Sequence, residues 1–166
     1  MVRRGGFRPW VGGNIGDVLL DVLPSIQPDD RVVMELSSFQ LDIMTVSPQL
    51  AAVLNITPNH LDRHGTMEAY TRAKAQIIAH QGPDDVAVLG RDDPGSRQLA
   101  DSAPGALAWF SHNEMVADGA FMAGQRLLVA GLCSVDGEPR VVCERRDIHL
   151  RGDHNVLNVL AACAVA

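Results

Sequence analysis

The chain has 166 residues, which suits one domain of ordinary size with enough sequence to bury a hydrophobic core. Apolar residues make up 46% of it, only seven residues are Phe, Tyr or Trp, and the formal net charge is -6. This acidic composition leaves no basic surface of the kind that follows a phosphate backbone, so nucleic acid is not expected as a partner.

The cysteines and the apolar runs indicate the cellular setting. Cys133, Cys143 and Cys163 are odd in number and widely spaced, which fits neither a disulfide framework nor a C-x-x-C metal knuckle. Asp17 and Asp21 interrupt the only early apolar run, so no signal peptide or membrane span is expected. We therefore expect a cytoplasmic protein with reduced thiols and no membrane partner.

Short β-branched runs alternate with helical patterns along the chain, which is typical of βαβ units. The pattern predicts an α/β fold in which a mostly parallel, Rossmann-like sheet is covered by helices on both faces. Strands are expected near Arg8–Val11, Arg31–Leu36, Ala51–Ile56, Val86–Leu89 and Leu107–Phe110. Helices are expected over Ile15–Leu23, Met67–His80, Pro94–Ser102 and from Asp153 to the end of the chain.

The pattern changes between residues 111 and 151, where AFMAG, QRLLVAG and PRVVCER are separated by turns that contain glycine. These runs predict antiparallel strands appended to the parallel sheet. We expect residues 1–166 to form a single truncated domain with this insertion in it. The opening strand and glycine-rich phosphate loop of a doubly wound domain are not found, and the last helix is apolar on every side after Asn158.

Polar groups follow three of the expected strands, and parallel sheets bind ligands at the carboxyl ends of their strands. The first end is VGGNIG, where glycines permit a tight turn and Asn14 lies at the mouth of a helix. This motif is neither G-x-G-x-x-G nor G-x-x-x-x-G-K, so by itself it favours a purely structural turn. A nicotinamide-binding domain is disfavoured for the same reason.

The second strand end is VVMELSSFQL, in which Glu35 closes an apolar strand and is followed by Ser37 and Gln40. A carboxylate in that place is costly to bury unless a cation or hydrogen-bond donors meet it. A Mg²⁺ ion could supply the cation that compensates the Glu35 carboxylate. The alternative, which this segment supports equally well, is a strand-terminal glutamate that faces water.

The third strand end is NITPNHLDRHGTMEAYTRAK, residues 55–74, in which His60, Asp62 and His64 precede a helix capped by Thr66. Lys74 lies on the apolar face of that helix and is the only lysine beside thirteen arginines. Unlike arginine, a desolvated lysine can lose its proton and react with carbon dioxide. A snorkelling lysine and a turn histidine are the plain alternatives, but Glu35, His60 and Lys74 are expected to converge on adjacent strand ends.

The motifs GGNIG, ELSSFQL, NITPNHLDRHGTMEAYTRAK and GDHNVLNVLAA, in this order and spacing, resemble the central domain of the peptidoglycan Mur ligases. ELSSFQL is similar to the D-glutamate-adding member of that family. The resemblance implies ATP-dependent amide formation between UDP-N-acetylmuramoyl-L-alanine and D-glutamate through an acyl phosphate, with Mg²⁺ as cofactor and ATP as co-substrate.

The resemblance also implies roles for particular residues. Glu35 and His60 would be Mg²⁺ ligands, and Lys74 would carry a carbamate that adds a further oxygen ligand, which makes Lys74 and His60 the catalytic candidates. Asn14, Ser37, Gln40 and His60 would contact the muramoyl substrate. Asn155 and Asn158 would reach the nucleotide.

The chain departs from the family in one respect that bears on activity. The ATP-binding loop G-x-x-G-K-[ST] has no match, and the single lysine is already placed on a helix. We therefore expect a fragment that is inactive alone, since phosphoryl transfer depends on positioning and charge neutralisation. Two alternatives stay open: another Mur or folylpolyglutamate-type ligase, and a small metal-dependent hydrolase that uses Glu35, His60, Asp62 and His64.

Overall fold

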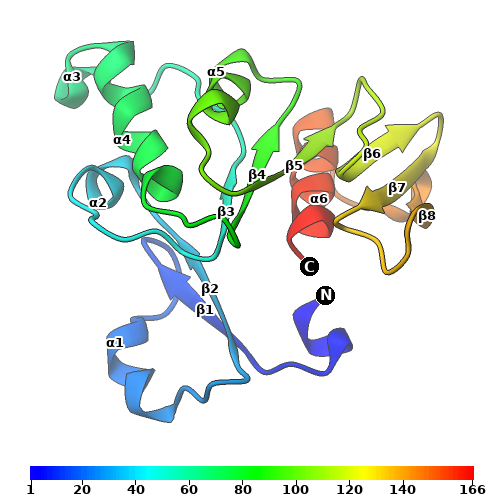
Figure 1. Cartoon of the computed structure of the whole chain (residues 1–166), viewed down its shortest axis with the longest axis horizontal. Helices are drawn as coiled ribbons and strands as arrows, with labels where there is room; N and C mark the ends of the chain where they lie inside the picture. Colours follow the sequence, from blue (N-terminus) through cyan, green and yellow to red (C-terminus); the bar gives the residue numbers. More distant parts are fainter.

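Six strands form the main sheet of the protein in this computed structural model, which describes residues 1–166. Their order in space is their order in the chain: β3 (Leu50–Val53), β4 (Val86–Gly90), β5 (Ala106–Ser111), β6 (Gly119–Ala123), β7 (Arg126–Gly131) and β8 (Gly137–Glu144). The first four are parallel, and β6, β7 and β8 pair antiparallel. The expected mostly parallel α/β fold is confirmed, with the antiparallel strands at one edge (Figure 1).

Helices cover both faces of this sheet. On one face lie α4 (Met67–Ala79) and α5 (Pro94–Gln98), which continues as a 3-10 turn over Leu99–Ser102. On the other face lies α6 (Asp153–Val165), which packs mainly on β4, β5 and β6. Side chains alternate between two cores, so that Val88 and Phe110 pack under α6 while Leu89 packs under α4.

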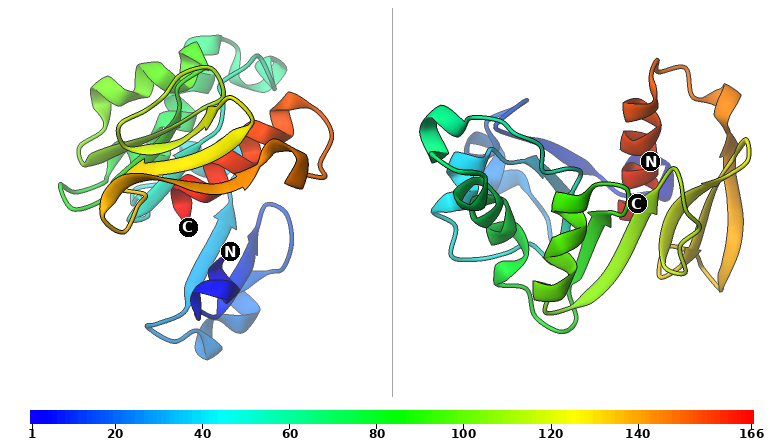
Figure 2. Two further views of the ribbon diagram at one scale, coloured as in Figure 1. Left: turned by 90° about the vertical axis from the view of Figure 1, so that its right-hand side faces the viewer. Right: turned by 90° about the horizontal axis from the view of Figure 1, so that it is seen from above.

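The first two strands stand apart from the main sheet, which corrects the expectation of a single sheet. β1 (Pro9–Gly13) and β2 (Arg31–Glu35) pair in parallel and form a separate two-stranded ladder. Every residue of β2 is exposed, and Figure 2 shows the ladder projecting from the rest of the molecule. The sequence pattern could not reveal this, because apolar β-branched residues predict strands but not which strands pair.

The helical segments differ in part from expectation. Helix α1 covers only Leu19–Val22. Gly16 has a left-handed conformation with φ of 94°, so the non-helical turn after β1 continues through it and the helix begins later than expected. Two short helices, α2 (Ser38–Asp42) and α3 (Leu61–His64), follow the second and third strand ends and were not expected. Short 3-10 turns lie at Val2–Gly5, Leu23–Ser25 and Arg145–Asp147.

The cysteines are all free thiols: Cys163 is buried, and Cys133 and Cys143 are partly buried. None of the helices combines the length and the apolar character that crossing a membrane requires.

Candidate active site

The glycine turn after β1 lies directly beside Glu35. The Asn14 N–H donates a hydrogen bond to the Glu35 carbonyl oxygen at 2.8 Å. Gly13 has a φ of 117°, and a Cβ there would lie 2.3 Å from the same carbonyl oxygen. Glycine is therefore required for the close approach of the two strand ends, which places the exposed Asn14 side chain next to the end of β2.

Helix α2 begins immediately after Glu35 and is held by a capping box. The Ser37 hydroxyl accepts from the Gln40 N–H at 3.3 Å, and the Gln40 side-chain oxygen accepts from the Ser37 N–H at 2.9 Å. The Ser37 hydroxyl also lies 2.9 Å from that side-chain oxygen. Part of the polarity of Ser37 and Gln40 therefore stabilises the start of α2, and their expected contact with a substrate stays a prediction.

His60 occupies the turn that starts α3. It is the only residue other than glycine with a positive φ, at 52°, and its side chain is exposed. Its ring lies 5.4 Å from the ring of Phe39 in α2, measured between centroids. Such a left-handed residue is often found where a surrounding structure holds a functional side chain in place.

Lys74 points inward from α4, as expected from the helical pattern. Burial lowers the pKa of its amine, and the negative charge of Glu35 partly opposes that shift. No carboxylate lies within ion-pairing distance of the amine. The structure therefore brings Glu35 close enough to act on Lys74 electrostatically, while the amine remains partly desolvated and unpaired.

Three aromatic rings and one serine join α2, α3 and α4, and the sequence did not point to this cluster. The His64 Nε2 lies 2.9 Å from the hydroxyl of Ser38, which is 3% exposed. The His64 ring stacks on Phe39 with 3° between the ring planes and meets the edge of Tyr70 with 5.3 Å between centroids. His64 therefore belongs to the contact between these helices.

The residues named for a metal fit Mg²⁺ only if Lys74 takes part. Nowhere in the protein do three His, Cys, Asp or Glu side chains gather so that they could hold a metal ion. The metal site assumed for the hydrolase alternative is therefore wrong, because Glu35, His60, Asp62 and His64 do not form such a group. A carbamate on Lys74 would add an anionic oxygen to the ligands expected from Glu35 and His60, and oxygen ligands are those that Mg²⁺ prefers.

A separate pocket of about 440 Å³ opens at the carboxyl ends of β3 and β4, beside the first turns of α6. Its polar lining consists of Asn55, Thr57, Asp92, Asp93, His154 and Asn158. Asn158 lines the pocket, whereas the Asn155 side chain donates to the Arg151 carbonyl oxygen at 2.8 Å and is not part of the lining. Their expected contact with a nucleotide stays a prediction.

Several of these lining residues escaped the sequence analysis. Asp92 and Asp93 follow β4 after Arg91, so applying the strand-end rule to GRDD would have found them. The Asp92 carboxylate accepts from the Ser111 hydroxyl at 2.6 Å and from the His112 N–H at 2.7 Å. The sequence offered no reason to single out His154, because it is simply one residue in the first turn of α6.

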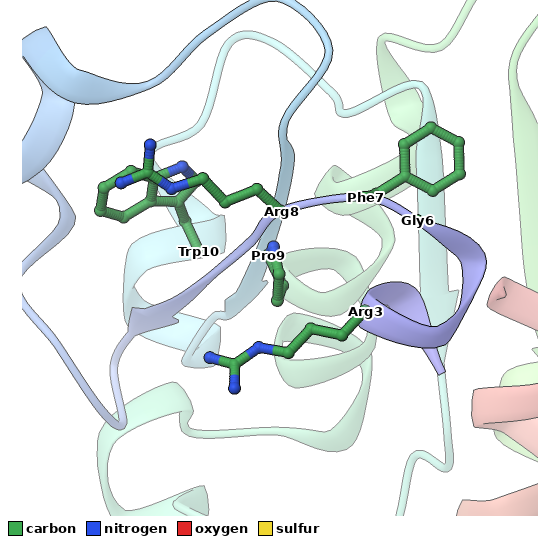
Figure 3. Close-up of a pocket in the computed structure, with 6 residues that line it drawn as sticks. All are labelled: Arg3, Gly6, Phe7, Arg8, Pro9 and Trp10. Carbon is green, nitrogen blue, oxygen red and sulfur yellow. The ribbon is translucent and has the colours of Figure 1, made fainter.

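Another pocket, of about 530 Å³, lies at the opposite, amino end of β1. Arg3, Gly6, Phe7, Arg8, Pro9 and Trp10 line it (Figure 3). The Arg8 guanidinium lies 4.3 Å from the centre of the Trp10 ring, and the Trp10 indole N–H donates to the Asp30 carboxylate at 2.7 Å. Because Asn14 and Glu35 follow the other ends of these strands, this pocket is separate from the candidate active site.

Comparison with known proteins decides the family. The family model described as the Mur ligase middle domain matches residues 22–166. The chain belongs to the Mur ligase middle-domain family. The match covers all of the candidate active site except the glycine turn with Asn14.

Two similar curated proteins carry the same name. The chain is 40% identical over 162 residues to UDP-N-acetylmuramoylalanine--D-glutamate ligase of Clostridium botulinum strain Langeland, covering 98% of the chain and 34% of that protein. It is 42% identical over 162 residues to the enzyme of the same name in Pelotomaculum thermopropionicum, covering 97% and 35%. The chain thus spans about a third of the length of these Mur ligases.

Solved Mur ligase structures share the fold. MurF from Acinetobacter baumannii superposes with a TM-score of 0.66 at 20% identity, covering 98% of the chain and 37% of that protein. The MurF ligase of Thermotoga maritima in complex with ADP superposes with a TM-score of 0.60 at 16% identity, covering 98% and 39%. At these identities the likeness supports the fold alone.

Proposed function

We propose that residues 1–166 form part of the central domain of an ATP-dependent ligase that joins D-glutamate to UDP-N-acetylmuramoyl-L-alanine. Support comes from the family match and from the name shared by the curated relatives. The ligase would act in the cytoplasm on these two substrates and ATP, without nucleic acid or membrane partners. The antiparallel strands at residues 111–151 would be an insertion within the same domain.

The observation that carries the proposal is the state of the Lys74 amine. It is partly buried on α4, its pKa is lowered by that burial, and the nearby charge of Glu35 does not form an ion pair with it. A neutral amine attacks carbon dioxide, forms a nitrogen–carbon bond and releases its proton to solvent, which leaves an anionic carbamate. Burial that lowers the pKa of the single lysine therefore raises the fraction of neutral amine that can react with carbon dioxide.

Glu35, His60 and the carbamate of Lys74 would hold Mg²⁺. The ion would neutralise phosphate charge when ATP is bound. Asn14, Ser37, Gln40 and His60 surround the same strand ends and would orient the muramoyl substrate. Asn158, from the pocket at β3 and β4, and Asn155, to whose side-chain oxygen Asn158 donates at 3.4 Å, would contact the adenine side of the nucleotide.

Replacement of Lys74 tests the proposal in a ligase of the relatives' length that contains this segment. Lys74→Ala should lose most amide synthesis, because the site loses the amine that makes the carbamate. Lys74→Arg should fail as badly, since arginine keeps the charge but cannot be carbamylated. Acetate or another small carboxylate should partly restore the alanine variant and do little for the arginine variant, whose side chain fills the space.

The control is a carboxylate series at fixed ionic strength with the wild-type enzyme. Equal activity of Lys74→Arg and wild type would show that Lys74 acts only through its charge. Use of an amino acid other than D-glutamate would favour another Mur or folylpolyglutamate-type ligase.

A further inference from the structure

His64 links the three helices around the candidate site. It is the last residue of α3, whose N-cap is His60, and its ring stacks on Phe39 of α2, the helix that follows Glu35, with 5.0 Å between centroids. The rings of His64 and Tyr70 meet edge-on, with 5.3 Å between their centroids. Tyr70 lies on α4, one turn before Lys74. No other side chain in the site links all three helices through ring contacts or hydrogen bonds.

Hydrogen bonding within the sheet does not fix the separation between Glu35 and the other ligands. Glu35 ends β2, and the β1–β2 ladder shares no hydrogen-bonded strand pair with the main sheet. Helix α2 follows Glu35 at once and packs on α4, which carries Lys74. The position of Glu35 relative to His60 and Lys74 therefore depends on how α2 is held against α3 and α4 (Figure 1).

We propose that His64 is a positioning residue that holds α2 against α3 and α4 through its hydrogen bond to Ser38, and so sets the separation of Glu35 from His60 and Lys74. The inference rests on the proposed function, because it concerns the geometry of that metal site. The His64 side chain acts through its neighbours, and the hydrogen bond from His64 to a candidate ligand is a backbone one, from its N–H to the His60 carbonyl oxygen at 3.0 Å.

The hydrogen bond adds something that ring packing alone does not supply. Stacked and edge-on rings tolerate sliding, whereas a hydrogen bond between Nε2 and the buried Ser38 hydroxyl fixes both distance and direction. Ser38 is the first residue of α2, three residues after Glu35, so fixing it fixes the start of the helix that follows the ligand. His64 is thus placed to act on Glu35 at short range.

The test follows Mn²⁺ in the presence of bicarbonate, with the 166-residue chain labelled at lysine Cε with carbon-13. Because Lys74 is the only lysine, the label gives a single side-chain signal, which bound Mn²⁺ broadens. His64→Phe and Ser38→Ala should each raise the Mn²⁺ concentration for half-maximal broadening about 10-fold, the usual effect of removing a residue that supports metal ligands. His64→Gln, whose amide can replace Nε2, should restore most of the loss.

The double variant tests whether the two residues act through one bond. Ser38→Ala combined with His64→Phe should again raise the concentration about 10-fold, not about 100-fold, since a shared interaction can be lost only once. The control is His80→Phe, the same exchange at an exposed position after α4, which should leave the signal's response unchanged.

Each outcome separates the two proposals. Equal Mn²⁺ response in wild type and His64→Phe would overturn the positioning role alone, and so would a lowered midpoint of thermal unfolding with no change in Mn²⁺ response. Absence of any broadening in the wild type, with and without bicarbonate, would overturn the proposed metal site and this inference with it.

Discussion

The Lys74 amine lies 5.8 Å from the centre of the Tyr70 ring, one turn further along the same face of α4. Tyr70 is 5% exposed and has a hydroxyl whose pKa is raised by burial. The buried Tyr70 ring thus lies beside the lysine side chain. Burial lowers the pKa of the Lys74 amine and so raises its neutral fraction relative to an exposed lysine.

The Lys74 amine should titrate below the ordinary lysine pKa of about 10.4, because burial disfavours its charged form. Glu35→Gln should lower that pKa further, since it removes the negative charge that stabilises the ammonium. At any pH near the midpoint of the lysine titration, a larger fraction of the Lys74 amine should therefore be neutral in Glu35→Gln than in the wild type. Carbon-13 NMR of the single labelled lysine measures both titrations.

Glu68→Gln is the matched control, because Glu68 is exposed on the same helix and does not contribute to the shift of Lys74. An unchanged or raised pKa in Glu35→Gln would show that the two side chains do not interact.

Gly13→Ala should open the end of the β1–β2 ladder. A Cβ at Gly13 would lie 2.3 Å from the Glu35 carbonyl oxygen, so the strands would have to separate. Gly6→Ala is the control, because Gly6 also has a positive φ but has nothing within 4 Å of the added atom. Both changes carry a conformational cost of roughly 1 kcal/mol, and only Gly13→Ala should speed amide hydrogen exchange in β2. Equal exchange rates in the two variants would contradict the close approach at Gly13.

Ser96→Ala should destabilise the carboxyl ends of β3 and β4. The Ser96 hydroxyl is fully buried, donates to the Val53 carbonyl at 2.8 Å and accepts from the Gly90 N–H at 3.0 Å. Its loss leaves buried backbone groups without a partner, which costs about 1–3 kcal/mol of the free energy of unfolding. Ser102→Ala, at an exposed hydroxyl that bonds only within its own turn, should cost no more than about 0.5 kcal/mol. Urea denaturation of both variants checks the difference.

The 166-residue chain should bind ATP weakly or not at all. The pocket at β3 and β4 offers Asn158 and His154, but the sequence contains no G-x-x-G-K-[ST] loop for the phosphates. The phosphate charge would also lie over a chain of net charge -6. Isothermal titration calorimetry with Mg²⁺ and ATP is the measurement, and micromolar binding would show that other residues grip the phosphates.

The sequence predicted what depends on local chemistry. Thr66 caps α4 through the Ala69 N–H at 3.2 Å, and Lys74 lies on the inner face, because capping and helical periodicity are properties of a few neighbouring residues. The parallel pairing of β3, β4 and β5 and the antiparallel pairing of β6, β7 and β8 also followed from strand and turn patterns. The parallel pairing of β6 with β5 was not expected, because its run was predicted to be antiparallel.

What the sequence missed depends on distant parts of the chain. The contact of His64 with Ser38 joins residues 26 positions apart, and nothing in LDRH or SSFQ signals it. The short helices α2 and α3, of five and four residues, are too brief to show a periodic pattern. The Asn155 side chain donates to the Arg151 carbonyl oxygen and accepts from the Asn158 side chain at 3.4 Å, local contacts that the resemblance did not reveal. Its expected contact with the nucleotide stays a prediction.

The separation of the β1–β2 ladder from the main sheet has a consequence for how the molecule melts. The two units share no strand pair, and β2 buries none of its residues, whereas Val88, Leu89 and Leu160 are completely enclosed in the body of the protein. Two units that share no strand pairing and differ so much in burial unfold with different free energies. Heating should therefore unfold the β1–β2 ladder before the main sheet and its helices. Glu35 and Asn14 would then leave the site while Lys74 still sits in a folded framework, and binding would fade at a lower temperature than the bulk unfolding signal.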